Sequence, residues 1–185
     1  MIFYLVRHGQ TDWNLQKRMQ GHRNIPLNDA GIRQMNDLAD RIVKDGIGFD
    51  RLITSPLDRA KRSAEIIAEK TGFKDIILDE NFIERDFADL EGEIWRPDLD
   101  LNDPKYKVET IEELCDRARR AINGYEFSEN EKVMIVTHGA FMAALKSVLS
   151  DRRLGYHDRK VPIIQGNILC CVKEKGKEAV FFNMF

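Results

Sequence analysis

The sequence is poor in cysteine and proline, with three cysteines and five prolines in 185 residues. The cysteines are Cys115, Cys170 and Cys171, an odd count without a C-x-x-C spacing. Such a set argues against a disulfide framework and against a cysteine-based metal site. We therefore expect reduced thiols in a cytoplasmic protein.

The sequence also lacks a long apolar run and a large charge of either sign. No stretch approaches the roughly 20 apolar residues that a membrane-spanning helix needs. The first apolar run, Ile2–Val6, is too short for a secretion signal and lacks a basic start. The formal net charge of −2 does not favour nucleic acid, whose partners usually carry a strong basic excess. We expect no membrane and no nucleic-acid partner, and the oligomeric state stays open.

The composition is that of a folded protein. Hydrophobic residues make up 43% of the chain and charged residues 32%, which is the balance found in globular domains. A chain of this length can bury a substantial core. The length therefore predicts a single domain, residues 1–185, with room for a small insertion.

Short apolar runs, several of them β-branched, predict the strands. Uniformly apolar runs suit strands that are buried on both faces, as in a parallel sheet. The predicted strands are Ile2–Val6, Arg51–Thr54, Ile76–Leu78, Val133–Val136, Ile163–Ile164, Ile168–Val172 and Ala179–Phe182. The last two suggest a hairpin around Lys175 and Gly176.

Helical patterns alternate with these runs. Apolar residues near a 3.6-residue period predict helices at Asn28–Lys44, Leu57–Lys70, Thr110–Ile122 and Phe141–Leu149. Ser55 is the predicted N-cap of the second helix, with Pro56 at its first position. Thr110 and Glu113 form a predicted capping box. This order indicates an α/β fold, a three-layer α/β/α sandwich with a mostly parallel central sheet.

Two stretches do not fit the alternation. Asp12–Pro26 is polar and predicts a long loop over a functional edge. Residues 90–108 contain Gly92, Pro97, Pro104 and several aspartates, and predict a short irregular lid insertion.

Two of the four histidines occupy equivalent places in this pattern. His8 and His138 each follow a predicted buried strand and each precede a glycine. Ligands of open α/β sheets bind in the crevice beyond the carboxyl ends of the strands. We expect the two imidazoles to face one another there, where Gly9 and Gly139 let the backbone approach a ligand.

Arginines add positive charge at the same edge. Arg7 precedes His8, and Arg59 lies in the first turn of the helix that follows a third strand. Arginine offers paired donors to phosphate oxygens, and helix N-termini add partial positive charge. The sequence therefore predicts a site for a tetrahedral dianion.

A histidine in such a site can attack phosphorus directly. A neutral imidazole has a free lone pair near pH 7, and nearby cations keep it neutral. Attack would give a phosphohistidine on His8 that water resolves. Glu84 is the candidate acid and base, with Asp86 as its rival and Asp89 and Glu91 as further candidates. Two histidines and a carboxylate could instead hold a metal, but two arginines would repel a divalent cation, so no metal or cofactor is expected.

Six segments carry a more specific pattern. They are Arg7 to Asn14, Gly21 to Asn28 with Gly31 and Gln34, Ser55 to Ala60 with Ser63 and Ala64, Glu84 with Phe87, Leu90, Glu91 and Gly92, Glu109–Thr110 with Arg117, and Val136 to Gly139. They resemble the motifs of the histidine phosphatase superfamily, in its phosphoglycerate mutase-like branch of short bacterial-type phosphatases. The first looks like RHGxTxxN.

The resemblance implies a phosphoryl acceptor, His8, and a proton donor, Glu84, which it favours over Asp86. The groups that it implies around the phosphoryl oxygens are Arg7, Arg59, His138, Asn14 and the Gln20–Gly21 backbone. Gly139 is expected to border the substrate. The pattern departs from the family at Ala88 (usually Gly), Asn24 (usually Asp), Asn28 (usually Thr or Ser) and Gln165–Asn167 (usually Asn-x-Ser).

The same resemblance separates hydrolysis from phosphoryl transfer. The mutases of the family resemble longer chains whose insertion holds the substrate carboxylate and keeps water from the phosphohistidine. The insertion here is short, which favours hydrolysis of a small phosphorylated metabolite. A phosphoglycerate mutase-type transfer is the alternative, and a phosphate-binding regulatory module without turnover is the alternative of another class.

Overall fold

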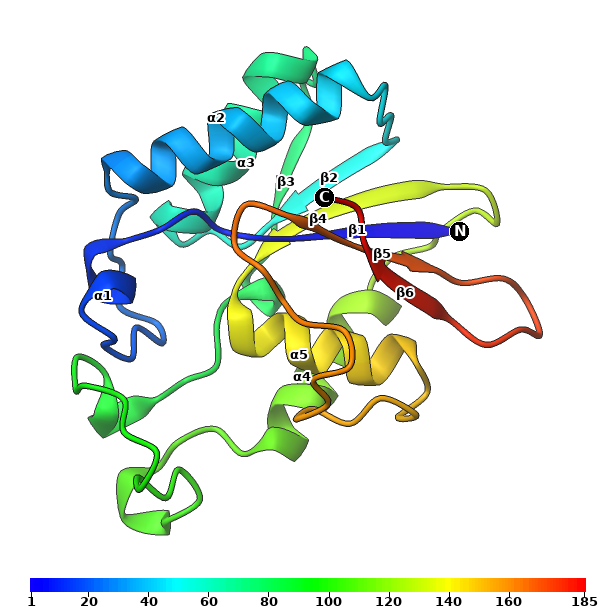
Figure 1. Ribbon diagram of the computed structural model, residues 1–185. Helices are drawn as coiled ribbons and strands as arrows, with labels where there is room; N and C mark the ends of the chain where they lie inside the picture. Colours follow the sequence, from blue (N-terminus) through cyan, green and yellow to red (C-terminus); the bar gives the residue numbers. More distant parts are fainter.

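Six strands form one mixed sheet in the computed structural model, which describes residues 1–185 (Figure 1). Their order across the sheet is β3 (Ile76–Leu78), β2 (Arg51–Thr54), β4 (Lys132–Thr137), β1 (Ile2–Arg7), β5 (Ile168–Val172) and β6 (Val180–Asn183). The first four are parallel, whereas β5 is antiparallel to β1, and β6 to β5. The predicted mostly parallel sheet and late hairpin are confirmed.

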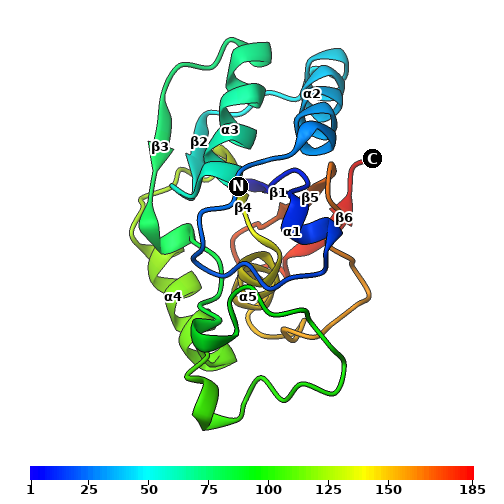
Figure 2. The same ribbon diagram turned by 90° about the vertical axis from the view of Figure 1, so that its left-hand side faces the viewer.

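Helices cover both faces of the sheet, so that the molecule has three layers (Figures 1 and 2). One face carries α2 (Asp29–Lys44) and α3 (Asp58–Thr71), and the other carries α4 (Ile111–Asn123) and α5 (Gly139–Leu149). Alternate side chains of a strand point to opposite faces. Phe3 and Leu5 of β1 therefore pack with α4 and α5, while Tyr4 and Val6 pack with α2 and α3. The predicted sandwich is confirmed.

None of these helices combines the length and the apolar character that crossing a bilayer requires. All three cysteines are buried free thiols.

Of the two predicted helix caps, the structure has one, and it has a further cap at Asn28. Asn28 caps α2 by accepting the N–H of Gly31 at 2.9 Å, and Thr110 forms the predicted capping box with Glu113. The N-cap predicted at Ser55 is wrong, because α3 begins only at Asp58 and its N-cap, Leu57, makes no side-chain cap bond. The side chain of Ser55 turns instead toward His138, 2.8 Å away.

Two further predictions need correction. Ile163–Ile164 forms no strand. Its neighbour β5 already lies between β1 and β6, so no free sheet edge is available there. The stretch Asp12–Pro26 is not entirely loop, because it begins with the short helix α1 (Asp12–Leu15), which Thr11 caps with its hydroxyl.

The segment 90–108 leaves the sheet and packs on the loop that follows α1. It begins at the end of a 3₁₀ turn, Ala88–Leu90, and contains a second one at Pro104–Tyr106. Arg18 and Ile94 form an isolated bridge between the two loops. Met19, Leu90 and Val108 form a small apolar cluster of their own. This segment lies near the carboxyl ends of β1 and β4 (Figure 1).

Candidate active site

The two central strands end side by side at one edge of the sheet. Arg7, the last residue of β1, is in register with Thr137, the last residue of β4. His8 donates its backbone N–H to the Thr137 carbonyl at 2.9 Å, and His138 becomes the N-cap of α5. The two imidazole rings consequently lie with their centroids 5.1 Å apart. The strand register thus brings the two histidines together.

Arg59 enters from the first turn of α3 and is fully buried. Its guanidinium donates to the carbonyls of Gly21 at 2.8 Å and Arg23 at 2.7 Å, and its Nε donates to Nδ1 of His138 at 3.2 Å. These bonds fix the plane of the cation beside both imidazoles. Burial lowers its pKa to about 10, against the opposing effect of Glu84 and Glu91, so it stays charged near neutral pH.

The environment of His8 fixes its tautomer. Its Nδ1 lies 2.7 Å from the carbonyl oxygen of Gly9, and a carbonyl can only accept, so Nδ1 carries the hydrogen. Nε2 is then left with its lone pair. Burial, followed by the charges of Arg59 and Arg7, holds the pKa of His8 well below its usual range, although the Gly9 bond opposes this. His8 is therefore a neutral imidazole.

His138 is held differently. Its Nδ1 accepts from Arg59, so its Nε2 carries the hydrogen and donates to Oγ of Ser55 at 2.8 Å. Burial is the main cause that lowers the pKa of His138 well below its usual range, followed by the charge of Arg59. Both ring nitrogens of His138 are thus occupied, whereas His8 keeps one lone pair.

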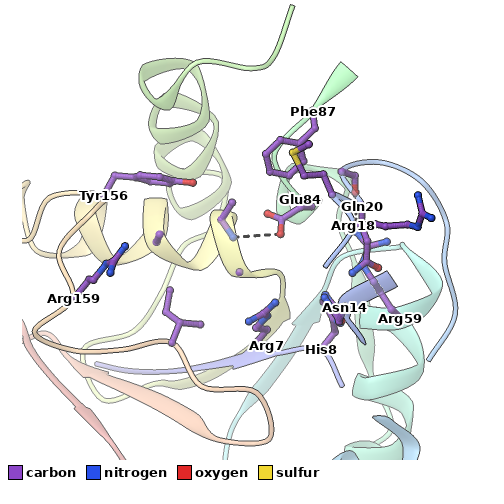
Figure 3. Close-up of a pocket in the computed structure, with 16 residues that line it drawn as sticks. Arg7, His8, Asn14, Arg18, Gln20, Arg59, Glu84, Phe87, Tyr156 and Arg159 are labelled. Carbon is purple, nitrogen blue, oxygen red and sulfur yellow. Dashed lines mark hydrogen bonds between the residues drawn. The ribbon is translucent and has the colours of Figure 1, made fainter. Parts of the chain in front are cut away.

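Glu84 supplies the carboxylate of the site. Its oxygens accept the backbone N–H groups of Arg85 at 2.9 Å, Phe141 at 3.0 Å and Ala140 at 3.3 Å. The last two donors belong to the first turn of α5, and Figure 3 shows the carboxylate poised above that turn. The start of the helix thereby holds the side chain at the mouth of the pocket.

The rival carboxylates lie outside the pocket. Asp86 accepts the N–H of Ala88 at 2.7 Å, and Glu91 accepts the N–H of His22 at 2.6 Å and pairs with Arg23 at 3.3 Å. Glu84 is the only one of the four candidates, Asp89 included, that lines the cavity.

Hydrogen-bond donors without a partner in the chain border the same cavity. Nε of Arg7 is buried without a hydrogen-bond partner, and burial lowers the pKa of this side chain while Glu84 opposes the shift. Asn14 and Gln20 accept hydrogen bonds through their amide oxygens, from the backbone N–H and the hydroxyl of Thr11, and their amide nitrogens make no bond within the chain. An oxyanion placed between these groups would find donors on several sides.

The cavity that these groups border has a volume of about 590 Å³. Nine residues were predicted for the site, and seven of them line the cavity beside Arg59: Arg7, His8, Asn14, Gln20, Gly21, Glu84 and Gly139. Arg59 also lines it, and His138 lies behind His8. Further lining residues, not among those predicted for the site, are Arg18, Met19, Phe87, Ala140, Ala143, Tyr156, Arg159 and Ile163. Figure 3 shows Tyr156 and Arg159 across the pocket from Arg18 and Arg59.

The side chains of the site do not form a recognisable set of metal ligands. No group of three or more His, Cys, Asp or Glu side chains is gathered in a metal-binding arrangement. The arginines that flank His8 would in addition repel a divalent cation.

Comparison with known proteins adds an independent finding. Residues 3–177 match the family model of the histidine phosphatase superfamily, branch 1. The chain belongs to this superfamily. It is 42% identical over 153 residues to PhoE of Bacillus subtilis (strain 168), described as an uncharacterized phosphatase, with 79% of this chain and 76% of PhoE covered.

Other superfamily members have different activities in their names. A 2,3-bisphosphoglycerate-dependent phosphoglycerate mutase of Methylobacterium sp. (strain 4-46) is 32% identical over 167 residues, which cover 80% of each chain. A mutant phosphoserine phosphatase of Entamoeba histolytica, solved with phosphoserine, superposes with a TM-score of 0.78 at 25% identity, covering 97% of this chain and 94% of that one.

The departures of this histidine phosphatase superfamily member from the motifs have structural counterparts. Asn24 accepts the N–H of Asp58 at 2.8 Å and so caps α3 from a distant loop. Gln165 donates to the carbonyl of His8 at 3.1 Å and to Asn14 at 3.2 Å, which ties the last loop to the first motif. Ala88 has a φ of 45°, in the left-handed region where the usual glycine is less strained.

Proposed function

We propose that the chain is a phosphomonoesterase that hydrolyses a small phosphorylated metabolite through a phosphohistidine on His8. The observation that carries the proposal is the hydrogen bond from Nδ1 of His8 to Gly9, which leaves the Nε2 lone pair directed at a pocket flanked by Arg7 and Arg59. The names of PhoE and of the phosphoserine phosphatase support a hydrolytic reaction.

The first step forms a bond from Nε2 of His8 to phosphorus and breaks the bond from phosphorus to the ester oxygen. Arg7, Arg59, Asn14 and Gln20 provide donors for the phosphoryl oxygens, with the Gly21 and Gly139 backbone beside them. His138 holds Arg59 through Nδ1, and its Nε2–H must leave Oγ of Ser55 before it can donate to the phosphoryl group. Glu84 takes part in this step in its protonated form. Glu84 then gives that proton to the departing oxygen, which leaves as an alcohol.

The second step reverses the roles. Glu84, now a carboxylate, takes a proton from water, whose oxygen bonds to phosphorus as the bond to Nε2 of His8 breaks. Inorganic phosphate and the neutral imidazole result. No metal takes part in either step, since the arginines supply the positive charge.

The short segment 90–108 favours water as the second acceptor, because little chain is available to seal the pocket. The similarity to the Methylobacterium mutase keeps phosphoryl transfer as the second candidate. Transfer would return the phosphoryl group to another hydroxyl of the substrate, and it would need a bisphosphorylated primer.

The test is an assay with p-nitrophenyl phosphate and 3-phosphoglycerate, with and without a chelator. We expect phosphate release that the chelator leaves unchanged and that falls at least about a thousandfold in His8→Ala. Circular dichroism checks that the variant is folded. Chelator-sensitive release, or full activity of the variant, would overturn the mechanism. Formation of 2-phosphoglycerate without phosphate release would identify a mutase, and binding without turnover would identify a regulatory module.

A further inference from the structure

The pocket extends well beyond the phosphate end. A second hollow of about 320 Å³ adjoins it and shares Ala143, Tyr156, Arg159 and Ile163 with it. Gly139 and Ala140 in the first turn of α5, and Ala143 one turn later, line the first cavity, and Lys146, three positions beyond Ala143, lines the second. Since an α-helix rises about 1.5 Å per residue, the groove follows α5 for on the order of 10 Å. A leaving group several atoms long fits this groove.

The middle of the groove is apolar. The methyl groups of Ala140 and Ala143 form one side, and Ile163 and the ring of Tyr156 border it from the loop between α5 and β5. Burial raises the pKa of Tyr156 to about 12, with Glu84 adding to the shift, so the phenol is neutral and carries no charge to repel an anion. This stretch suits the carbon skeleton of a substrate.

The cavity contains more positive charge than one phosphate group requires. Four arginines line the first cavity, and Glu84 is its only acid. Arg7 and Arg59 flank His8, and Arg18 already donates to Gln16 at 2.8 Å and to the Gly92 carbonyl at 2.7 Å. Arg159 makes no hydrogen bond and no ion pair within the chain, although Asp158 also lines the adjoining hollow.

The backbone around Arg159 is nevertheless fixed by hydrogen bonds. The buried ammonium of Lys146 donates to the carbonyls of Asp158 at 2.6 Å and Val161 at 3.1 Å, one on each side of Arg159 in the sequence. These two hydrogen bonds from α5 fix the loop backbone beside the groove. Because the backbone that carries the guanidinium is already ordered, less conformational entropy is lost when Arg159 binds a ligand.

We infer that Arg159 binds a second anionic group of the substrate, a carboxylate or a second phosphate, at the far end of the leaving group. The inference rests on the proposed function and names the class of substrate, a phosphomonoester with an additional negative charge. A guanidinium matches both kinds of anion with paired donors. A neutral leaving group would leave Arg159 without a partner.

The test compares substrates that differ only in this charge. The pairs are 3-phosphoglycerate with glycerol 3-phosphate, 6-phosphogluconate with glucitol 6-phosphate, and fructose 1,6-bisphosphate with fructose 6-phosphate. The first two pairs differ in length and test a carboxylate, and the third tests a second phosphate. We expect the charged member of at least one pair to have a kcat/KM about tenfold higher, the size of one partly exposed charge-assisted bond.

The variants Arg159→Gln, Arg159→Lys and Lys160→Gln locate the effect. We expect Arg159→Gln to reduce the ratio within the pair to about one, and Arg159→Lys to restore part of it. Lys160→Gln removes the same charge from the next residue, which borders neither hollow, and should keep the ratio. A ratio unchanged in Arg159→Gln, or no preference in any pair, would overturn the inference and leave the proposed function intact.

A binding measurement tests the anion subsite even if the protein hydrolyses none of these compounds. Dissociation constants of the same pairs, titrated into His8→Ala with and without Arg159→Gln, do not depend on turnover. If the wild-type protein hydrolyses none of the compounds, the proposed function fails, while a preference lost with Arg159 still supports the anion subsite. Equal dissociation constants within every pair would exclude it.

Discussion

At the scale of single residues, neighbours give two identical side chains different chemistry. A backbone carbonyl holds the hydrogen of His8 on Nδ1 and leaves Nε2 free. Arg59 and Ser55 occupy both nitrogens of His138. Only His8 is therefore arranged as a nucleophile, whereas His138 is arranged as a donor through Nε2. The strand pattern placed both histidines at the same edge without separating them, and only the resemblance of Arg7 to Asn14 to the motif RHGxTxxN singled out His8.

Glu84 allows a prediction that depends on the leaving group. Replacement Glu84→Gln removes the acid but keeps the size of the side chain. We expect kcat/KM for 3-phosphoglycerate, whose alkoxide needs protonation, to fall about a hundredfold or more. The value for p-nitrophenyl phosphate, whose leaving group is stable as an anion, should fall much less. Steady-state assays with both esters measure the difference.

Asp86→Asn is the matched control, since Asp86 is two residues away and outside the pocket. It should affect both esters equally and weakly. Equal losses for the two esters in Glu84→Gln would assign Glu84 to positioning rather than to proton transfer.

At the scale of elements, local patterns predicted most of the fold. Buried runs such as Ile2–Val6 and the period of Asn28–Lys44 gave strands and helices within a few residues of their observed bounds, because burial on one or two faces controls both patterns. Ser55 failed as a cap because its hydroxyl serves the distant His138. A tertiary contact of this kind leaves no trace in a local pattern.

The site was less predictable at its far end than at its phosphate end. Strand ends converge at one sheet edge by topology, which is how His8 and His138 could be paired. The loop that carries Arg159 has no regular structure, and its position depends on two bonds from Lys146. A buried lysine that binds backbone carbonyls cannot be distinguished in sequence from an exposed one.

The start of α2 packs unusually closely on the segment after His8. A methyl group on Gly31 would overlap the carbonyl oxygen of Gln10, and one on Gly9 would overlap the carbonyl of Gly31. Gly31→Ala should therefore lower the free energy of unfolding by about 2 kcal/mol, although alanine favours a helix. It should also reduce kcat, because the displaced segment carries His8. Urea unfolding and steady-state assays measure the two effects.

Arg33→Ala is the control on the same helix, since Arg33 is exposed and makes no hydrogen bond. Its unfolding free energy should stay within about 0.5 kcal/mol of the wild type. Wild-type stability of Gly31→Ala would show that the added methyl group fits beside the Gln10 carbonyl without displacing it.

At the scale of the whole molecule, the two buried histidines connect the site to the pH dependence of stability. Their pKa values in the folded protein lie below the value of about 6.5 in an unfolded chain. Between these values the unfolded chain binds more protons, so the free energy of unfolding falls as the pH drops below about 6.5. Each histidine contributes a slope of up to about 1.4 kcal/mol per pH unit, and this loss is absent above that pH.

Urea unfolding between pH 7.5 and pH 5 measures this slope. We expect His138→Gln to have a slope smaller by up to about 1.4 kcal/mol per pH unit, since one proton fewer is taken up. His157→Gln, which replaces an exposed histidine, should keep the wild-type slope. Identical slopes in all three proteins would mean that His138 titrates in the folded state as it does in the unfolded chain.

The order of the strands in the sheet also determines when β1 can pair during synthesis. β1 is synthesised before both of the strands that it pairs with, β4 and β5. At about 5–20 residues per second, a ribosome needs on the order of ten seconds to proceed from Arg7 to Lys132. Throughout that time the apolar segment Ile2–Val6 has no strand beside it, and such unpaired segments are prone to aggregate. The strand that positions His8 therefore stays unpaired until β4 has been synthesised, and during that time it is open to association with other chains.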